Sequence, residues 1–189
     1  STGDQPVDRS YRYAVPSDSV LPTHVTHVID IVDRSNVRAK ADPSPQTTVS
    51  TRTIWNRAGD KFFMLNANRG PSRISALLVD ARTGDATVLT RDSSATWVEM
   101  SHQFGRENWE VVKGSDDLVF WSQRDGWGHL YRIGTDGTVK NQIESGTNVV
   151  DRLFRVDSAT RTSQPVVYFS AWGRDPGFLY YSHLYKVNI

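Results

Sequence analysis

Short apolar runs separated by turn-forming residues dominate the chain. No stretch of about eleven residues or more carries the i, i+3, i+4, i+7 apolar spacing of an amphipathic helix. The runs are rich in β-branched and aromatic residues and are bounded by glycine, proline, asparagine and aspartate, as strands are. The pattern therefore predicts an all-β protein, with strands at Val25–Val32, Thr51–Trp55, Lys61–Leu65, Ile74–Val79, Ala86–Thr90, Leu118–Ser122, His129–Ile133, Thr138–Ile143, Arg152–Val156, Val166–Ala171 and His183–Val187.

The strands recur as a repeating unit. Three apolar runs, each ending in a small polar residue, align as Lys61–Asn66, Asp117–Ser122 and Pro165–Ser170. A second strand follows each run, and His129–Ile133 corresponds residue for residue to His183–Val187. A repeat of about 50 residues with four strands per unit is typical of a β-propeller blade.

Two further features favour the propeller. Each unit begins with another strand, at Thr51–Trp55, Thr96–Met100 and Val149–Phe154. Leu118–Trp121 is apolar at every position, which is expected of a strand whose sheet is covered on both faces. A β-sandwich remains the alternative, because its central strands are also apolar.

The strand count predicts three to four blades of four-stranded antiparallel sheet. Because propellers typically contain four to eight blades, we expect a partial β-propeller cut from a larger ring. Residues 1–22, with three prolines, are predicted to form an extended N-terminal segment. The propeller fragment, residues 23–189, divides into the blade pieces 23–48, 49–95, 96–147 and 148–189.

Composition narrows the classes of function. Lysine and arginine total 22 against 21 aspartate and glutamate, so no basic excess favours nucleic-acid binding. The absence of cysteine excludes disulfides, thiolate metal sites and cysteine nucleophiles. No apolar run approaches the roughly 18 residues of a membrane span, and the first residues lack the pattern of a signal peptide.

Several short motifs occur in a fixed order along the chain. They are Tyr11–Pro16, Ile54–Trp55 with Gly59–Lys61, Asn68–Arg69 with Val79–Gly84, Thr96–Val98, Phe120–Tyr131, and Val167–Ala171 with His183–Val187. Together they resemble the N-terminal β-propeller of the dipeptidyl peptidase IV family of serine peptidases, in the prolyl oligopeptidase clan. Tyr11–Pro16 is similar to the RYP segment of that family and Thr96–Val98 to its TWV step. The resemblance covers about residues 9–189.

The resemblance implies a function for the protein to which this chain belongs. Members of the family combine an eight-bladed propeller with a C-terminal α/β-hydrolase domain that carries a Ser/Asp/His triad. They remove dipeptides from peptide N-termini, preferring proline or alanine at the second position, and the propeller gates access and forms part of the substrate pocket. The implied partners are the hydrolase domain and a peptide substrate, and the family favours a periplasmic or secreted location.

The chain itself lacks the expected catalytic motif. The nucleophile of an α/β-hydrolase lies in Gly-x-Ser-x-Gly, which does not occur; Ser72 and Ser115 each lack the second glycine. The paired glutamates with which the family binds the substrate amine precede the RYP segment, so no residue corresponds to them here. We therefore expect a non-catalytic portion of a serine exopeptidase, without cofactor or metal.

The candidate pocket residues follow the TWV step. The resemblance implies an aromatic and an arginine from this loop, for which the candidates are Phe104 and Arg106, with His102 beside them. Such residues would supply an apolar wall and a donor to a substrate carbonyl. The alternative is an ordinary loop aromatic and a solvated arginine.

The remaining chemistry-bearing residues are interpreted as structural. Arg124-Asp125-Gly126 favours a hairpin turn over a peptide contact, with aspartate accepting from backbone amides and glycine at positive φ. The repeated His-Leu-Tyr sequence is predicted to hold structural residues rather than metal ligands. Asp116-Asp117 precedes a strand and is expected in a turn. The structural set comprises Arg124, Asp125, Gly126, Trp127, His129, Tyr131, His183 and Tyr185.

Two alternatives to the peptidase propeller stay open. One is a stand-alone propeller-like module that binds peptide or protein, and the other is a carbohydrate-active propeller enzyme with inward carboxylates. A cut propeller also leaves open strand edges and a bare apolar face. We therefore expect isolated copies to form homodimers through these faces.

Overall fold

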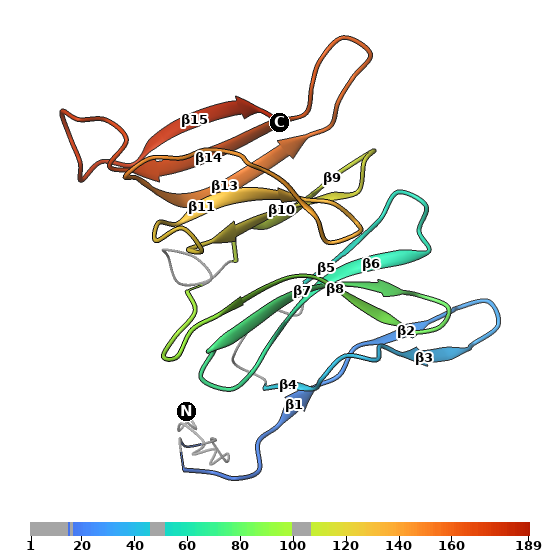
Figure 1. Ribbon diagram of the computed structural model, residues 1–189. Coiled ribbons are helices and arrows are strands. Elements are labelled where there is room, and N and C mark those ends of the chain that lie inside the picture. The colour runs from blue at the N-terminus through green and yellow to red at the C-terminus, as the bar shows by residue number, and fades with distance from the viewer. Residues whose placement is uncertain (1–14, 16, 46–51, 100–106) are drawn as a thin grey trace, which may run out of the picture.

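The computed structural model describes residues 15, 17–45, 52–99 and 107–189. Within these ranges the chain contains strands and turns but no helix, so the all-β prediction is confirmed. In the described part of the chain, no helix is long and apolar enough to span a membrane. The described strands form two small and three larger antiparallel sheets, which Figure 1 shows in succession from the blue to the red end of the chain.

The two small sheets come first. The first consists of β1 (Thr23–His24) and β4 (Ser44–Pro45), and the second of β2 (His27–Ile29) and β3 (Asn36–Arg38). Lys40 N donates to Gly84 O at 2.7 Å, which joins this region to the next sheet. A Cβ at Gly84, where φ is +75°, would overlap the carbonyl oxygen of Arg38, so glycine permits both the turn and the close approach.

Two of the larger sheets are four-stranded meanders in which each strand pairs with the next. The first comprises β5 (Thr53–Trp55), β6 (Lys61–Ala67), β7 (Arg73–Asp80) and β8 (Ala86–Ser93). The second comprises β9 (Trp109–Val112), β10 (Asp117–Ser122), β11 (His129–Ile133) and β12 (Val139–Gln142). The third larger sheet has three described strands: β13 (Val149–Asp157), β14 (Val166–Trp172) and β15 (His183–Asn188).

The three larger sheets stack face to face, and the core lies between them. Trp109, Leu118 and Phe120 belong to the core between the β5–β8 and β9–β12 sheets. Val119 and Trp121 belong to the core between the β9–β12 and β13–β15 sheets. Alternate residues of β10 therefore face opposite neighbours, which explains why Leu118–Trp121 is apolar at every position.

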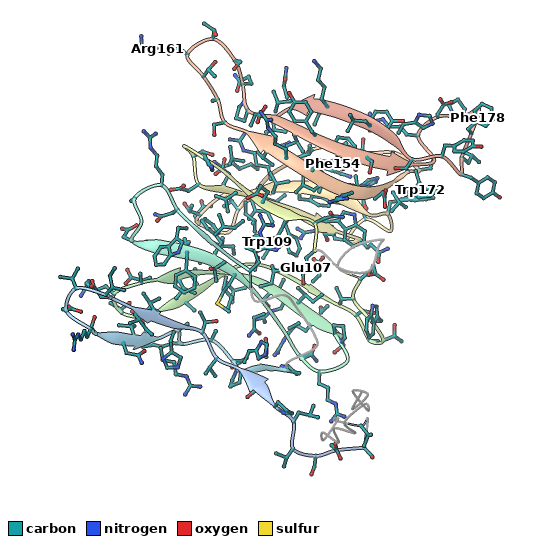
Figure 2. All side chains as sticks on the ribbon, turned by 180° about the vertical axis from the view of Figure 1, so that it is seen from behind. Glu107, Trp109, Phe154, Arg161, Trp172 and Phe178 are labelled. Carbon is teal, nitrogen blue, oxygen red and sulfur yellow. The ribbon has the colours of Figure 1, made fainter. Side chains whose placement is uncertain are left out.

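This arrangement is that of successive propeller blades rather than a two-layer sandwich. In Figure 2 Trp109 lies between stacked sheets, whereas Phe178 lies in the loop at one end of the β13–β15 sheet. Trp109 is 2% exposed and Phe178 is 62% exposed. The described sheets form a partial propeller, and no closed ring is present among them.

The predicted strand at Thr96–Met100 is wrong. Residues 96–99 have no strand conformation, and residue 100 lies outside the described ranges. The first strand of the β9–β12 sheet is instead β9, in which Trp109 pairs with Phe120 of β10. Both segments contain tryptophan and valine, so pairing with β10 rather than local composition selects the strand.

The predicted alignment of Pro165–Ser170 with Asp117–Ser122 is shifted by one residue. Trp121 pairs with Leu130 in the β9–β12 sheet, and Ser170 pairs with Leu184 at the matching position of the β13–β15 sheet. Ser170 is therefore the counterpart of Trp121. Because side chains alternate between the faces of a strand, this shift decides which residues face inward and which outward.

Candidate functional site

The predicted pocket residues His102, Phe104 and Arg106 lie outside the described residues. The described chain offers two other regions with concentrated polar chemistry. One surrounds the β10–β11 loop, and the other lines a groove on the β13–β15 sheet.

The β10–β11 loop is a turn held by its own side chains. Asp125 Oδ1 accepts a hydrogen bond from the Trp127 amide at 3.1 Å. Gly126 has a φ of 95°, and its amide donates to Gln123 O at 2.9 Å. The side chain of Trp127 in this loop is 41% exposed. The loop therefore has the turn geometry that aspartate and glycine provide.

Arg124 connects this loop to the preceding sheet. Its guanidinium donates to Thr90 Oγ1 at 3.0 Å and to Asp92 Oδ1 at 3.2 Å, both on β8. The same group lies 4.6 Å from the centroid of the Tyr131 ring. A second cross-sheet pair joins Arg52 to Glu110 of β9 at 2.6 Å. These arginines join neighbouring sheets, and neither is left free to bind a substrate.

His129 lies beneath the loop with its side chain 1% exposed. Its Nδ1 lies 2.7 Å from Asp125 Oδ2, and Gln142 Nε2 donates to the same oxygen at 2.7 Å. Because an ionised carboxylate only accepts hydrogen bonds, Nδ1 carries the proton. Burial alone would raise the pKa of Asp125, but hydrogen bonds from His129, the Trp127 amide and Gln142 together lower it.

A second carboxylate faces the other side of the imidazole. Glu144 Oε1 lies 3.8 Å from His129 Nε2, and its side chain is 2% exposed. Glu144 Oε2 accepts from Asn148 Nδ2 at 2.7 Å and from Arg174 Nη1 at 3.3 Å. Burial raises the pKa of Glu144, while Asn148, His129 and Arg174 partly oppose the shift. The group links the β9–β12 sheet to the segments that flank β13 and β14.

Tyr131 completes this polar group. It lies two positions after His129 on β11, and residues with this spacing share one face of a strand. Burial raises the pKa of Tyr131 to about 12, and the nearby Asp125 carboxylate adds to the shift. A phenol in this environment stays neutral through the physiological range.

His183 and Tyr185 occupy the corresponding positions of the next sheet. His129 pairs with Ser122, and His183 pairs with Ala171. Tyr185 stacks on Phe169 with centroids 5.7 Å apart, and Arg174 lies 5.0 Å from its ring. No group of three or more histidine, cysteine, aspartate or glutamate residues in the described ranges could hold a metal ion.

The paired aspartates are not a catalytic dyad. Asp117 is 1% exposed, and its two oxygens accept from Arg132 and Lys140, each at 2.7 Å. Asp116 Oδ1 accepts from the Arg57 amide at 3.2 Å, across the two sheets. Both carboxylates are thus engaged in structural contacts.

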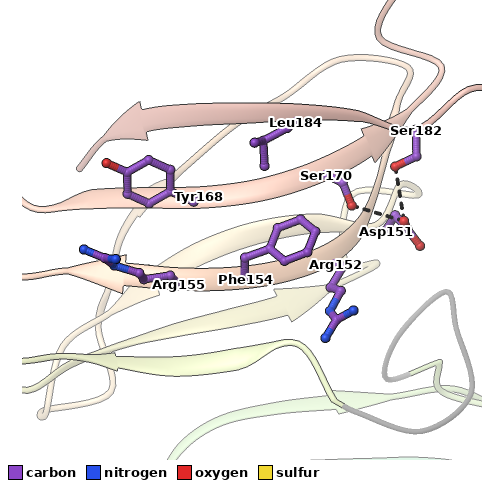
Figure 3. Close-up of a pocket in the computed structure, with 8 residues that line it drawn as sticks. All are labelled: Asp151, Arg152, Phe154, Arg155, Tyr168, Ser170, Ser182 and Leu184. Atoms are coloured by element: carbon purple, nitrogen blue, oxygen red, sulfur yellow. Dashed lines mark hydrogen bonds between the residues drawn. The ribbon is translucent and has the colours of Figure 1, made fainter.

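The groove lies on the face of the β13–β15 sheet that points away from the β9–β12 sheet. Figure 3 shows the residues that line it, and its volume is about 700 Å³. Phe154 and Leu184 supply exposed apolar surface, at 48% and 69% exposure. At one end, Asp151 Oδ2 accepts from Ser170 Oγ at 3.1 Å and Ser182 Oγ at 3.2 Å.

Sequence reasoning missed both Glu144 and Asp151. Glu144 lies in the connection between β12 and β13, fifteen positions beyond His129 (144 − 129). Asp151 occupies an irregularity of β13, where the register with β14 shifts between Val150 and Arg152. Glu144 has a near partner in the sequence, Asn148, but Arg174, Ser170 and Ser182 come from other strands and loops. The sequence alone therefore marks neither carboxylate.

Comparison with known proteins agrees with this architecture. The family model described as the dipeptidyl peptidase IV (DPP IV) N-terminal region matches residues 1–189. Dipeptidyl peptidase 4 of Porphyromonas gingivalis is similar in structure, with a TM-score of 0.67 at 15% identity over 87% of this chain and 22% of that one. A putative dipeptidyl aminopeptidase IV from Bacteroides ovatus gives a TM-score of 0.61 at 16% identity, over 90% of this chain and 29% of that one.

The structural similarities and the family match support different conclusions. At such low identities the two structures bear on the fold, and this chain spans less than a third of either. The family match, in contrast, extends over the whole length of the chain. The chain therefore belongs to the family of dipeptidyl peptidase IV N-terminal regions.

Proposed function

We propose that this chain is part of the non-catalytic propeller of a serine exopeptidase, where it gates and positions peptide substrates for a separate α/β-hydrolase domain. The observation that carries this proposal is the stack of three sheets, two of them four-stranded meanders, with two buried interfaces between them. Such a stack provides a rigid wall, and loops carried by a rigid scaffold can line a substrate passage.

Family membership supports the same role. Within a dipeptidyl peptidase IV-like protein, the hydrolase domain would supply the nucleophile that this sequence lacks. We propose Phe104 and Arg106, with His102 beside them, as the residues of this chain that contact the substrate. Uniform contacts of this kind contribute to binding rather than to the chemical step.

The proposal is tested in the full-length protein with a chromogenic N-terminal dipeptide substrate. Phe104→Ala and Arg106→Ala are expected to raise KM about tenfold with little change in kcat, which is the signature of lost ground-state and transition-state binding alike. Gln103→Ala, between His102 and Phe104 in the sequence, serves as the matched control and should leave both constants unchanged. Unchanged KM in both test variants would remove these residues from the pocket.

A stand-alone peptide-binding module is the second candidate, because the groove on the β13–β15 sheet is open and largely apolar. The reading frame that encodes this chain distinguishes the two. A downstream Gly-x-Ser-x-Gly sequence supports the peptidase propeller, and its absence supports the binding module.

A further inference from the structure

The outer face of the β13–β15 sheet differs from the other large sheet faces in the stack. The two interfaces within the stack bury large side chains such as Trp109 and Trp121, each 2% exposed. The outer face leaves Phe154 and Leu184 largely exposed, with the 700 Å³ groove between its side chains. An apolar sheet face of this kind is built to be covered by another layer.

The groove has a specific origin in the sequence. Trp121 fills the interface between the β9–β12 and β13–β15 sheets, and its Nε1 donates to Val150 O at 2.9 Å. The strand pairing places Ser170 at the corresponding position of the next sheet. A serine leaves a hollow where the preceding sheet has an indole, so a covering layer must bring its own bulk to this point.

A carboxylate without a complete set of partners lies at the end of this hollow. Asp151 is 7% exposed, and only Oδ2 receives the hydroxyls of Ser170 and Ser182. Oδ1 is buried and has no hydrogen-bond partner among the described residues. A buried carboxylate oxygen left in this state is costly, and a cation is the partner that best compensates it.

Two arginines, Arg152 and Arg155, also line the groove, and both have partners other than Asp151. Arg155 forms an ion pair with Asp157, and its guanidinium lies 5.9 Å from the Tyr168 ring. Arg152 lies 5.2 Å from the Phe154 ring. Among the described residues, no ion pair joins either arginine to Asp151.

The molecule already uses arginine–carboxylate pairs where its sheets meet. Arg52 pairs with Glu110 and Arg124 with Asp92 between the first two large sheets. Arg174 pairs with Glu144, at 3.3 Å, where the β9–β12 sheet meets the segments around β14. Asp151 is a further carboxylate on a sheet face of this stack, and its orphaned oxygen has no such pair among the described residues.

We propose that the groove is a receptor site for one lysine or arginine side chain, presented by a further β-sheet of the parent polypeptide that packs on this face. The cation binds Asp151, and the aliphatic stem packs against Phe154 and Leu184, as long basic side chains do. The inference rests on the proposed function, because it takes the parent protein to continue the stack of sheets.

The absence of cysteine in the chain allows a direct test by disulfide tethering. Leu184→Cys places a single thiol at the groove, and Leu179→Cys, at a position 58% exposed in the β14–β15 loop, provides the matched control. Each variant is equilibrated with cystamine and with hydroxyethyl disulfide, at a concentration where light scattering shows monomer. Tethering raises the effective concentration of each small group at the groove to about millimolar or above.

The measured quantity is the ratio of the mixed disulfide with cysteamine to the mixed disulfide with mercaptoethanol. We expect this ratio to be about tenfold higher in the Leu184→Cys variant than in the Leu179→Cys variant, because hydrogen bonds to charged groups are the stronger ones. The preference should disappear when Asp151→Asn is added. If that double variant does not fold, an anionic disulfide on the Leu184→Cys chain replaces it and should be the least favoured of the three. Equal preference at both positions would overturn the site without bearing on the KM test of the peptidase role.

Discussion

His129 Nε2 and Glu144 Oε1 face each other across 3.8 Å, and neither atom has a hydrogen-bond partner among the described residues. Because Nδ1 of the ring donates to Asp125, Nε2 of a neutral imidazole is an acceptor. Two acceptors then face each other, on side chains that are 1% and 2% exposed. A proton on Glu144 relieves this opposition, so the junction between sheets is sensitive to the protonation of this carboxyl group.

Replacing Glu144 with glutamine should stabilise the protein at neutral and alkaline pH. Burial raises the pKa of Glu144 above its ordinary 4.5, so the stability tied to its neutral form is complete below that value. It is lost as the pH rises through the folded-state pKa. Glutamine keeps the neutral shape at every pH and can donate to His129. We expect the urea midpoints of the two proteins to converge near about pH 4 and to separate by pH 8.

Glu110→Gln is the control for that experiment. It removes the ion pair between Glu110 and Arg52, and both side chains of that pair are about a quarter exposed. The free energy of unfolding should therefore fall by no more than about 1 kcal/mol at pH 8. A glutamine variant at position 144 that is less stable than the parent chain at pH 8 would contradict the account of this junction.

Replacing Asp125 with asparagine should act in the opposite direction. Its pKa lies below 3.8 because the hydrogen bonds that it accepts outweigh the effect of burial. The stability that the carboxylate contributes is therefore present above pH 3.8 and lost as the pH falls through the lower folded-state pKa. Because the side chain is 33% exposed, we expect a loss of only about 1 kcal/mol at pH 7. Denaturant titrations at pH 7 and in acid check this, and equal stability at pH 7 would refute it.

Truncating Trp121 should weaken the stack most strongly. Its side chain is buried between two sheets and donates to Val150 O, so Trp121→Ala leaves a cavity and an unpaired carbonyl. We expect a loss of about 3–5 kcal/mol in the free energy of unfolding. Trp97→Ala, at a position 57% exposed, should change stability by no more than about 0.5 kcal/mol. Similar effects at the two positions would mean that the interface does not depend on this indole.

Isolated copies of the chain should associate through the outer face of the β13–β15 sheet. Leu184→Glu places a charge in the exposed apolar patch and should shift the molar mass measured by light scattering toward the monomer. Leu179→Glu, at a position 58% exposed but in the β14–β15 loop, should leave the association unchanged. A parent chain that is monomeric at high concentration would contradict this prediction.

The sequence was sufficient for the strand order because the pattern of apolar runs is local. Both four-strand units and the final three strands are present, although the first strand of the β9–β12 sheet was misplaced. That strand is selected by the pairing of Trp109 with Phe120, a contact that no local pattern records. The one-residue shift at Ser170 has a similar cause, since the loop before His183 is longer than the loop before His129.

The polar site was harder to predict than the fold. Asp125 was identified because its turn is local, with aspartate beside glycine. Glu144 and Asp151 were missed because Arg174, Ser170 and Ser182, which hydrogen-bond to them, are distant in the sequence and are brought near by the fold. Both carboxylates are also buried, and burial is a property of the folded chain rather than of neighbouring residues in the sequence.

Dipeptide release from a peptide with proline at its second position tests the central claim most directly. The full-length protein that contains this chain is predicted to release the N-terminal dipeptide, whereas the 189-residue chain alone, which lacks Gly-x-Ser-x-Gly, is predicted to release none. Release by the isolated chain, or no release by the full-length protein, would contradict the assignment of this chain to the propeller of a serine exopeptidase.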